Sequence, residues 1–512
     1  MEEKQELPQG WVWTRIGEIA PTSSGGTPSR SNPSYFTGNI PWIKSGELGD
    51  GYVVEYSESI SEAALAGSSA KLFPKGTLLI ALYGATVGKV GILTMDAATN
   101  QAVCGIFLPE WVELKFAFNY LFSLRREFIE QGKGGAQPNI SQDIVRNTPF
   151  PLPPLPEQRR IVAKLEELFS RLDAGVAAVR RAQALLKRYR QSVLHAAVTG
   201  ELTRAWREAH PAPAETGAAL LARIRGERRA QWEAAQVAKR GGQLPLNDAW
   251  KSKYVAPPGP ETSGLPELPE SWSWATFEEI SERVTVGFVG SMKDEYVDEG
   301  VPFLRSQNVR ENKYSPIGLK YVSPTFDESI SKSRLEPGDV VVVRSGSVGT
   351  ACVIPDTLPA ANCSDLVIVK QPKVLPEYCA YYMNSVAKAR VNAQKVGVAL
   401  IHFNTQAQAA MPLSIPPLAE QAEIVAEVER RLTVLDALGQ TLADELKRAE
   451  RLRQSLLHRA FTGRLVPQDA TDEPAAALLA RLRAGAAVPA KAAKGKRKAK
   501  AEPESKQLSI KL

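Results

Sequence analysis

The sequence predicts an α+β protein with two globular domains joined by two long antiparallel helices, in a pseudo-two-fold internal duplication. Three observations predict this class. The second half of the 512-residue chain repeats the first at an offset of roughly 260 residues. Each half contains short apolar runs bounded by glycine, which are typical of buried strands. Each half also ends in a long amphipathic stripe, which is typical of a helix.

Composition indicates an ordinary globular protein with more than one domain. The chain is too long for a single core, and 44% of its residues are hydrophobic and 23% are charged. Its formal net charge of +7 favours a polyanionic partner only mildly, because many basic proteins bind no nucleic acid.

The four cysteines predict neither a zinc cluster nor a disulfide framework, because Cys104, Cys352, Cys363 and Cys379 show no Cys-x-x-Cys spacing. A reducing, cytoplasmic setting is therefore expected. No apolar run approaches the roughly 20 residues of a membrane span, and the polar first residues are unlike a signal peptide. We expect no membrane association.

Each predicted domain mixes strands and helices. The apolar run Thr77–Leu82 predicts a buried strand, and its counterpart Asp339–Arg344 is rich in β-branched residues and predicts the same. The stretches Phe116–Phe128 and Pro376–Ala393 are predicted to be helical. The mixture favours the α+β class.

A proline-rich segment closes each domain, and a long helix is predicted directly after it. The apolar stripes run from Ile161 to Ala197 and from Ile424 to Ala460, each covering 36 residues at a spacing close to 3.6. Such helices should be nearly straight and about 60 Å long. The two stripes bury each other most economically as an antiparallel pair. The alternative is that each helix packs on its own domain.

The segment after each long helix is duplicated too, because Leu220–Arg225 returns as Leu478–Arg483. Pro257–Pro260 predicts a linker before the second domain. The lysine-rich residues from about Ala484 onward predict a disordered tail, either merely solvated or in non-specific contact with a polyanion.

Two short motifs imitate catalytic sites without their essential parts. Asn32-Pro33-Ser34-Tyr35 resembles the Asn-Pro-Pro-Tyr loop of amino-methyltransferases, but it lacks the second proline and a preceding glycine-rich cofactor loop. We interpret it as a turn. The segment Gly84–Lys89 resembles a phosphate-binding loop, but it is one residue short, and Val90 stands where the magnesium ligand is needed.

Two further sets of polar residues also fall short of catalysis. Asp96, Glu113 and Lys115 imitate a metal nuclease site only at loose spacing, and the repeat does not preserve the lysine. His195 and His458 do repeat, but neither has a carboxylate or cysteine at ligand spacing, which favours packing or a helix-end hydrogen bond. The sequence therefore predicts no active site in this chain.

The duplication is uneven, and its differences point to two recognition tasks. Ile40–Ser45 matches Val301–Ser306 closely, whereas Gly25–Arg30 faces the dissimilar Gly287–Met292. Similar helices with divergent domains are expected if the helices fix the distance between the domains and each domain recognises a different target.

Several motifs follow one another along the chain, some of them in both halves, and together they are specific. They are Leu7–Trp11, Gly25–Ser29, Ile40–Ser45, Gln137–Ser141, Pro153–Val162 and Leu194–Gly200 in the first half, and Val301–Asn308, His402–Asn404, Pro416–Gln421 and Leu457–Gly463 in the second. In these motifs the chain resembles the DNA-specificity (S) subunits of Type I restriction-modification systems, over nearly its whole length.

The resemblance implies two target-recognition domains, each followed by a spacer helix. The implied organisation is 1–150, first target-recognition domain; 151–203, first spacer helix; 204–267, helical segment and linker; 268–413, second target-recognition domain; 414–466, second spacer helix; and 467–512, C-terminal helical segment and basic tail.

The resemblance also implies the partners. They are double-stranded DNA, two adenine-methyltransferase (M) subunits and, in some complexes, restriction-translocase (R) subunits. S-adenosylmethionine, ATP and Mg²⁺ would then belong to those partners, with no cofactor in this chain. The expected function is to direct a complex to a split, asymmetric target of two short words around a spacer of fixed length. The alternatives are a specificity subunit of a methylation-only complex and a structural coiled-coil scaffold.

Loops of each domain are expected in the major groove, with nearby cations on phosphates. Candidate contacts are the polar residues of the divergent loops and those directly after the repeated anchors; any one could instead belong to a turn or a solvated strand end. They are Thr27, Ser29, Arg30, Lys44 and Ser45 in the first domain, and Ser291, Lys293, Arg305, Ser306 and Gln307 in the second.

Overall fold

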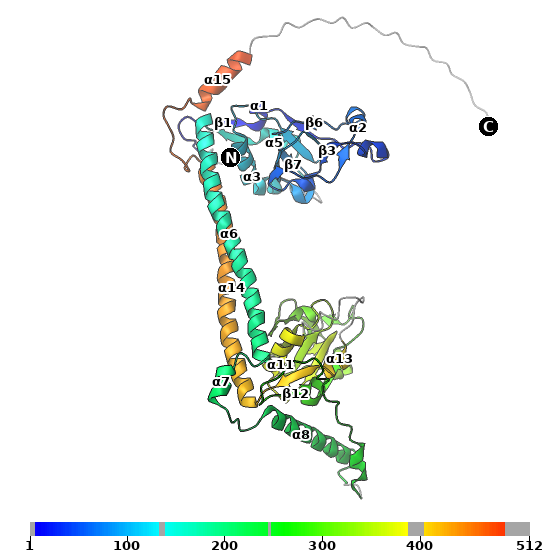
Figure 1. Ribbon diagram of the computed structural model, residues 1–512. Coiled ribbons are helices and arrows are strands. Elements are labelled where there is room, and N and C mark those ends of the chain that lie inside the picture. Colours follow the sequence, from blue (N-terminus) through cyan, green and yellow to red (C-terminus); the bar gives the residue numbers. More distant parts are fainter. Residues whose placement is uncertain (1–5, 133–138, 244–246, 388–403, 487–512) are drawn as a thin grey trace, which may run out of the picture. The chain divides into compact units, whose positions relative to one another are not determined.

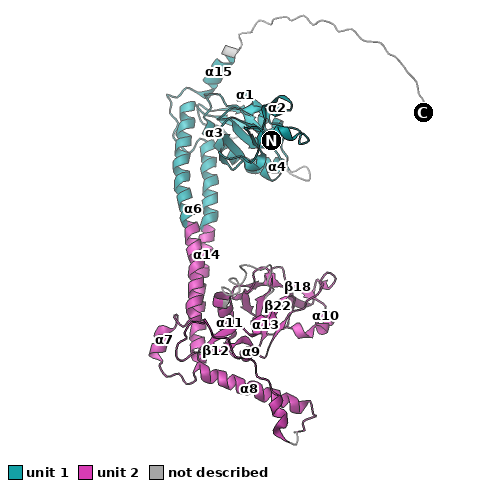
Figure 2. Ribbon diagram, turned by 45° about the vertical axis from the view of Figure 1, so that its right-hand side comes forward, with its two compact units in different colours: residues 1–178, 445–512 teal, residues 179–444 magenta. Residues whose placement is uncertain are grey.

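The computed structural model describes residues 6–132, 139–243, 247–387 and 404–486. The chain divides into two compact units, residues 1–178 with 445–512 and residues 179–444 (Figure 2). This division passes through both long helices, so the domain limits given above stay predictions. Parts of three expected features lie outside the described residues: the end of the second helical stretch, the motifs at 137–138 and 402–403, and the tail beyond residue 486.

The domain of the first unit contains three sheets, with strand orders β1-β11, β5-β3-β9-β6 and β2-β10-β7-β8-β4. Its strands are β1 (Val12–Arg15), β2 (Thr22–Ser24), β3 (Ile40–Ile43), β4 (Gly51–Val53), β5 (Ser59–Ile60), β6 (Leu72–Phe73), β7 (Leu78–Ala81), β8 (Val90–Leu93), β9 (Ala97–Thr99), β10 (Val103–Ile106) and β11 (Pro149–Leu152). Its helices are α1 (Ile16–Ile19), α2 (Glu62–Ala66), α3 (Leu114–Ser123), α4 (Arg125–Gln131) and α5 (Gln142–Asn147), with 3₁₀ turns η1 (Pro33–Phe36), η2 (Ser45–Glu47) and η3 (Gly84–Thr86). Antiparallel pairing of β1 with β11 brings the two ends of the domain together.

The second unit repeats this plan (Figure 1), with sheets β12-β23, β14-β18-β15-β21, β13-β22-β19-β20 and the hairpin β16-β17. Its strands are β12 (Ser273–Thr276), β13 (Arg283–Val286), β14 (Tyr296–Val297), β15 (Val301–Leu304), β16 (Val309–Arg310), β17 (Lys313–Tyr314), β18 (Lys320–Val322), β19 (Val340–Val343), β20 (Ala351–Val353), β21 (Asn362–Cys363), β22 (Leu366–Lys370) and β23 (Pro412–Ile415). Its helices are α7 (Arg204–Ala209), α8 (Gly217–Ala238), α9 (Phe277–Ile280), α10 (Pro324–Ser329), α11 (Pro376–Tyr382) and α13 (Thr405–Ala409), with shorter turns η4 (Asp248–Lys253), η5 (Ser306–Asn308), η6 (Ser331–Ser333) and η7 (Met383–Ala387).

The central strand of each domain is buried on both faces. In β7, Leu78 and Ile80 pack into one apolar cluster while Leu79 and Ala81 pack into another. The four valines of β19 alternate in the same way between two clusters. Because successive side chains of a strand point to opposite faces, an uninterrupted apolar run is what such a strand needs. Both predicted strands are confirmed.

The predicted helical stretches are confirmed with different limits. The first divides at Leu124 into α3 and α4. The second is helical through α11 and continues as η7 to Ala387, the last described residue of that segment.

A glutamine at the start of each long helix, α6 (Leu155–Val198) and α14 (Leu418–Phe461), fastens it to the adjacent domain. Gln158 accepts a hydrogen bond from the backbone N–H of Glu113 at 2.8 Å, directly before α3. Gln421 accepts one from Leu375 at 2.9 Å, directly before α11. Both glutamines are fully buried. These hydrogen bonds give a physical reason for the repeated segments Pro-Glu-Gln (156–158) and Ala-Glu-Gln (419–421).

The preceding glutamate is also buried in both repeats, but its partners differ. Glu420 accepts hydrogen bonds from Trp272 Nε1 at 2.8 Å and from Arg207 Nη1 at 2.5 Å. Glu157 accepts one from the neutral Gln468 at 3.3 Å. Burial raises the pKa of the Glu157 carboxyl, with smaller opposing contributions from its hydrogen bonds.

The two long helices run antiparallel in both units. Asp173 pairs with Arg453 in the first unit, and Arg190 pairs with Asp436 in the second. The residue on α6 advances by 17 positions between these pairs, and the residue on α14 moves back by 17. The predicted antiparallel arrangement is therefore confirmed. The alternative is also partly realised, because each helix begins against the domain that precedes it.

The duplicated segment after each long helix is helical, and each copy docks on the backbone just before the first strand of the domain in its own unit. The N–H of Gly217, which begins α8, donates to Ser271 O at 2.8 Å. The N–H of Ala475, which begins α15 (Ala475–Ala486), donates to Gly10 O at 2.9 Å. Gly10 and Ser271 are matched positions of the repeat, so the duplication extends to these contacts.

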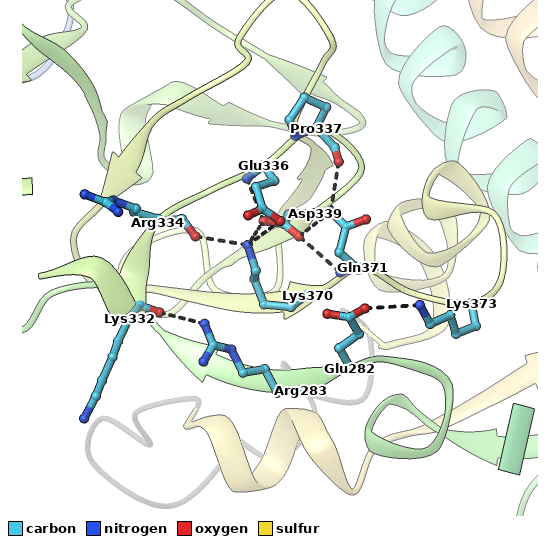
Figure 3. Close-up of polar contacts among 10 residues, drawn as sticks. All are labelled: Glu282, Arg283, Lys332, Arg334, Glu336, Pro337, Asp339, Lys370, Gln371 and Lys373. Atoms are coloured by element: carbon cyan, nitrogen blue, oxygen red, sulfur yellow. Dashed lines mark hydrogen bonds and ion pairs between the residues drawn. The ribbon is translucent and has the colours of Figure 1, made fainter. Parts of the chain in front are cut away.

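One buried polar network distinguishes the second domain (Figure 3). Asp339 is 0% exposed and lies 2.6 Å from Nζ of Lys370, which is 6% exposed and also donates to Arg334 O at 3.2 Å. The other oxygen of Asp339 accepts from the backbone and side-chain N–H groups of Gln371, both at 3.1 Å. Every charged atom of this pair thus has a partner, as a buried ion pair requires.

Candidate functional site

The residues that follow one pair of parallel strands lie at the same edge in each domain. In the first domain β3 pairs parallel with β9, and in the second β15 pairs parallel with β21. The carboxyl ends of parallel strands meet at one edge of a sheet. Asn100 N–H donates to Ile43 O and Ser364 N–H donates to Leu304 O, both at 3.0 Å, so the chain leaves each pair in the same way.

A side chain three residues further on closes the turn after β3 and β15. The N–H of Lys44 donates to Glu47 Oε2 at 2.8 Å, and the N–H of Arg305 donates to Asn308 Oδ1 at 3.0 Å. Ser45 and Ser306 begin the resulting 3₁₀ turns η2 and η5. These local bonds fix the direction in which the chain continues beyond the sheet edge.

The glycines of the divergent loops allow the loops to approach this edge closely. A side chain at Gly25 would collide with Thr99 at the end of β9, and one at Gly26 would collide with Ser69. In the second domain, a Cβ at Gly287 would lie 2.8 Å from Cys363 O at the end of β21. The candidate residues of each divergent loop are therefore anchored beside the paired strands.

Two of the predicted cations in the first domain share one carboxylate. Arg30 Nη1 lies 2.7 Å from Glu58 Oε2, and Lys44 Nζ lies 2.8 Å from Glu58 Oε1. The hydrogen bond from Lys44, supported by that from Arg30, lowers the pKa of the Glu58 carboxyl. The Arg30 guanidinium lies over the Phe36 ring, with Cζ 4.1 Å from its centroid.

The other candidates of the first domain are at the surface of the same loops. Thr27 is exposed and donates to Gln101, which follows β9. Ser29 is exposed and its hydroxyl lies 2.7 Å from that of Ser31. Thr27, Arg30 and Lys44 are thus brought to one edge.

In the second domain, two of the candidate DNA-contact residues donate hydrogen bonds to the same backbone carbonyl. Arg305 Nη2 and Gln307 Nε2 donate to Gly318 O at 2.7 Å and 3.0 Å. The Arg305 guanidinium also lies over Tyr296, with Cζ 5.7 Å from the ring centroid. Ser291 accepts a hydrogen bond from the backbone N–H of Lys293 at 3.5 Å.

Several residues of the two edges were missed from the sequence. Glu58 carries no motif and precedes β5, which pairs with β3, so only the sheet brings it to Lys44. Gln101 and Asp365 follow the second parallel strand of each pair; Asp365 lies 3.2 Å from Arg344 Nη1 and accepts from Ser345 at 3.0 Å. No motif in the sequence marks Gln101 or Asp365, because only the pairing of the strands brings them to these edges.

The rejected motifs lack catalytic geometry. Asn32 caps η1 by accepting from Ser34 N at 3.3 Å, which confirms the turn. The segment from Gly84 forms η3 and continues into strand β8, whereas a phosphate-binding loop must continue into a helix.

The repeated histidines do not pack inside. His195 and His458 both have exposed side chains, so the packing interpretation is wrong. At the end of α6 the backbone N–H and hydroxyl of Thr199 donate to the carbonyl of His195, at 3.1 and 2.9 Å. The helix-end hydrogen bond therefore uses the main chain of the histidine.

No group of three or more histidine, cysteine or acidic side chains among the described residues could hold a metal ion. None of the helices in the described ranges is long and apolar enough to cross a membrane.

Comparisons with known proteins agree on one family. The model described as "Type I restriction modification DNA specificity domain" matches residues 8–177 and 269–448. The chain is 25% identical to the Type I restriction enzyme EcoKI specificity subunit of Escherichia coli (strain K12), over 94% of this chain and 96% of that relative. It is 25% identical to the StySPI specificity subunit of Salmonella potsdam, over 94% and 97%.

Among solved structures, the chain is similar in fold to one from "Structural basis underlying complex assembly and conformational transition of the type I R-M system". The TM-score is 0.63 and the sequence identity 21%, with 90% of this chain and 100% of that chain covered.

Proposed function

Because this chain belongs to the Type I restriction modification DNA specificity family, we propose that each of its domains reads one word of a split, asymmetric DNA target. The family gives the chain its role as the DNA-specificity subunit of a Type I restriction-modification system. Such subunits are non-catalytic in general and act together with DNA, M subunits and R subunits.

One observation carries the proposal for two different words. Both domains present loops at the carboxyl edge of a parallel strand pair, with the same backbone turn but different side chains. Lys44 beside Glu58 in the first domain is replaced by Arg305 beside Gly318 in the second. Base pairs present distinct donor and acceptor patterns in the major groove, so different side chains on the same frame select different words. The ten residues predicted to contact DNA remain proposals.

The long helices are proposed to fix the spacer between the words. Each contains 44 residues, or about 66 Å of helix at about 1.5 Å per residue. A rigid spacer would hold the two words at a fixed separation, on the order of one helical turn of DNA between their centres, while the intervening sequence goes unread.

The proposed complex contains two adenine-methyltransferase subunits. Large apolar side chains remain exposed on the helices in the second unit: Leu185, Tyr189, Val434 and Leu438 are 61%, 50%, 52% and 48% exposed. Exposed apolar side chains at helical spacing favour docking of a partner. S-adenosylmethionine, together with ATP and Mg²⁺ where R subunits join, is assigned to the partners. A methylation-only complex remains the alternative.

The proposal is tested by modified-base sequencing of host DNA with and without this gene. Loss of adenine methylation at one interrupted, asymmetric motif, and its return on complementation, is the expected result. Unchanged methylation in a host whose M subunit is expressed would contradict the proposal.

A further inference from the structure

The Arg30 side chain in the first domain is in contact with two aromatic rings and one carboxylate. Its Cζ lies 4.1 Å from the centroid of Phe36 and 5.3 Å from that of Trp42, two rings that pack edge to face. Glu58 Oε2 forms an ion pair with Arg30 Nη1 at 2.7 Å. Among the described residues, Glu58 is the one polar partner of this guanidinium. The side chain nevertheless remains 56% exposed. The guanidinium is therefore open to a ligand, while the ring contacts and the ion pair restrict its movement.

The surrounding sheet fixes this arrangement before any ligand arrives. Glu58 O accepts a hydrogen bond from Trp42 N–H at 3.0 Å, and the next residue begins β5, which pairs with β3. The second oxygen of Glu58 is occupied by Lys44 at 2.8 Å. The carboxylate is thus shared by two cations and has little freedom to turn away.

The chemistry of this cluster favours a neutral base edge over a phosphate. A phosphate that approached Arg30 would also approach the ionised Glu58, which offsets part of the attraction exerted by Arg30 and Lys44. The O6 and N7 atoms of guanine are neutral acceptors whose spacing matches two parallel N–H donors of arginine. A guanidinium whose movement is already restricted by its neighbours loses less freedom on forming such a pair.

The second domain does not repeat the cluster. Met292 stands at the position of Arg30, and Arg305, at the position of Lys44, donates to the protein's own Gly318 carbonyl. Any recognition through Arg30 must therefore affect one of the two words.

We propose that Arg30 reads a guanine in one DNA word and that Phe36 and Glu58 are its positioning residues. The inference rests on the proposed function and deepens it by naming a base and the residue that reads it.

The test uses the full chain assembled with its M subunit and DNA duplexes carrying the methylated motif. Each guanine of both words, on either strand, is replaced in turn by 7-deazaguanine, which lacks the N7 acceptor. Replacement of one guanine in one word should lower the affinity of the wild-type complex by about fivefold or more, because Arg30 loses the N7 acceptor. Arg30→Lys keeps the charge but not the planar fork, so it should bind the natural duplex more weakly and lose sensitivity at that guanine alone. Sensitivity at the other word is the internal control.

Two variants separate positioning from simple loss of structure. Phe36→Leu keeps an apolar side chain but removes the aromatic face, so discrimination at that guanine should fall while binding to a scrambled duplex is unchanged. Glu58→Gln removes a negative charge, so binding to the scrambled duplex should rise while discrimination falls. A misfolded domain would lose both kinds of binding.

The inference is overturned if no guanine of either word is sensitive, or if Arg30→Lys keeps the full wild-type sensitivity at every guanine. In either case a complex that still methylates a split motif leaves the proposed function standing. A complex that recognises no split motif would instead overturn both.

Discussion

At the scale of single residues, the duplicated domains solve the same packing problem with different chemistry. Asp339 precedes β19 and Lys370 ends β22, where the first domain has Thr77 and Phe107 at the matched positions of β7 and β10. An apolar ring in one copy is thus replaced by a buried ion pair in the other. A buried charge is tolerated only when its partner remains in place.

Lys370→Met should therefore destabilise the second domain by about 3–5 kcal/mol, because it leaves Asp339 buried without its cation. The matched control is Lys373→Met, which removes a more exposed pair with Glu282 at 3.2 Å and should cost less than about 1 kcal/mol. Urea unfolding of both variants measures the difference. Equal, small changes would show that the buried pair contributes little.

At the scale of elements, the repeated glutamate contributes differently to the junction of each long helix with its domain. Glu420→Gln removes the charge that Arg207 needs and should cost about 3 kcal/mol or more. Glu157→Gln, at the matched position, should not destabilise the protein at neutral pH, because no arginine is bonded to that carboxylate. Thermal unfolding of the two variants provides the comparison; a larger loss for Glu157→Gln would contradict this account.

The same junction predicts a pH dependence. The folded pKa of Glu157 is raised above its ordinary value of 4.5 by burial. Between those two values the folded chain binds more protons than the unfolded chain, so stability falls as pH rises through this window. Above this window the carboxyl is ionised in both the folded and the unfolded chain, so its destabilising effect no longer changes with pH. Glu157→Gln should remove that fall from a series of melting temperatures, whereas an unchanged pH profile would exclude Glu157 as its source.

The antiparallel helices predict how the DNA spacer responds to their length. About one helical turn, four residues, is inserted after Ala178 in α6 and after Lys447 in α14, which are matched positions in the register of the two ion pairs. The methylated motif should keep both words and gain about two base pairs of spacer, since four residues add about 6 Å. Insertion in one helix alone is the control and should abolish methylation. An unchanged spacer with both insertions would exclude the helices as a ruler.

At the scale of the whole molecule, repetition and periodicity in the sequence predicted the central strands, the long helices and the duplication. The runs at Thr77–Leu82 and Asp339–Arg344 had the composition of strands buried on both faces, and the long stripes had the period of helices. The antiparallel pairing followed because two such stripes can cover each other.

The parallel pairing of β3 with β9 and of β15 with β21 could not be predicted in the same way. These strands are only two to four residues long and are separated by more than 50 residues, so local sequence does not specify their partners. Gln101 belongs to the site through that pairing, and Glu58 belongs to it through the antiparallel pairing of β5 with β3. Arg30 and Lys44 could be named as candidates, but their common carboxylate is a property of the folded sheet.

The central claim is that each domain reads one word on a common frame. The most direct measurement is modified-base sequencing of a host whose chain carries residues 269–413 in place of residues 8–150, with co-purification of the M subunit as the control for assembly. We predict a symmetric motif in which one wild-type word occurs twice, inverted, around the spacer. A methylated motif that still carried the two different wild-type words would contradict the claim.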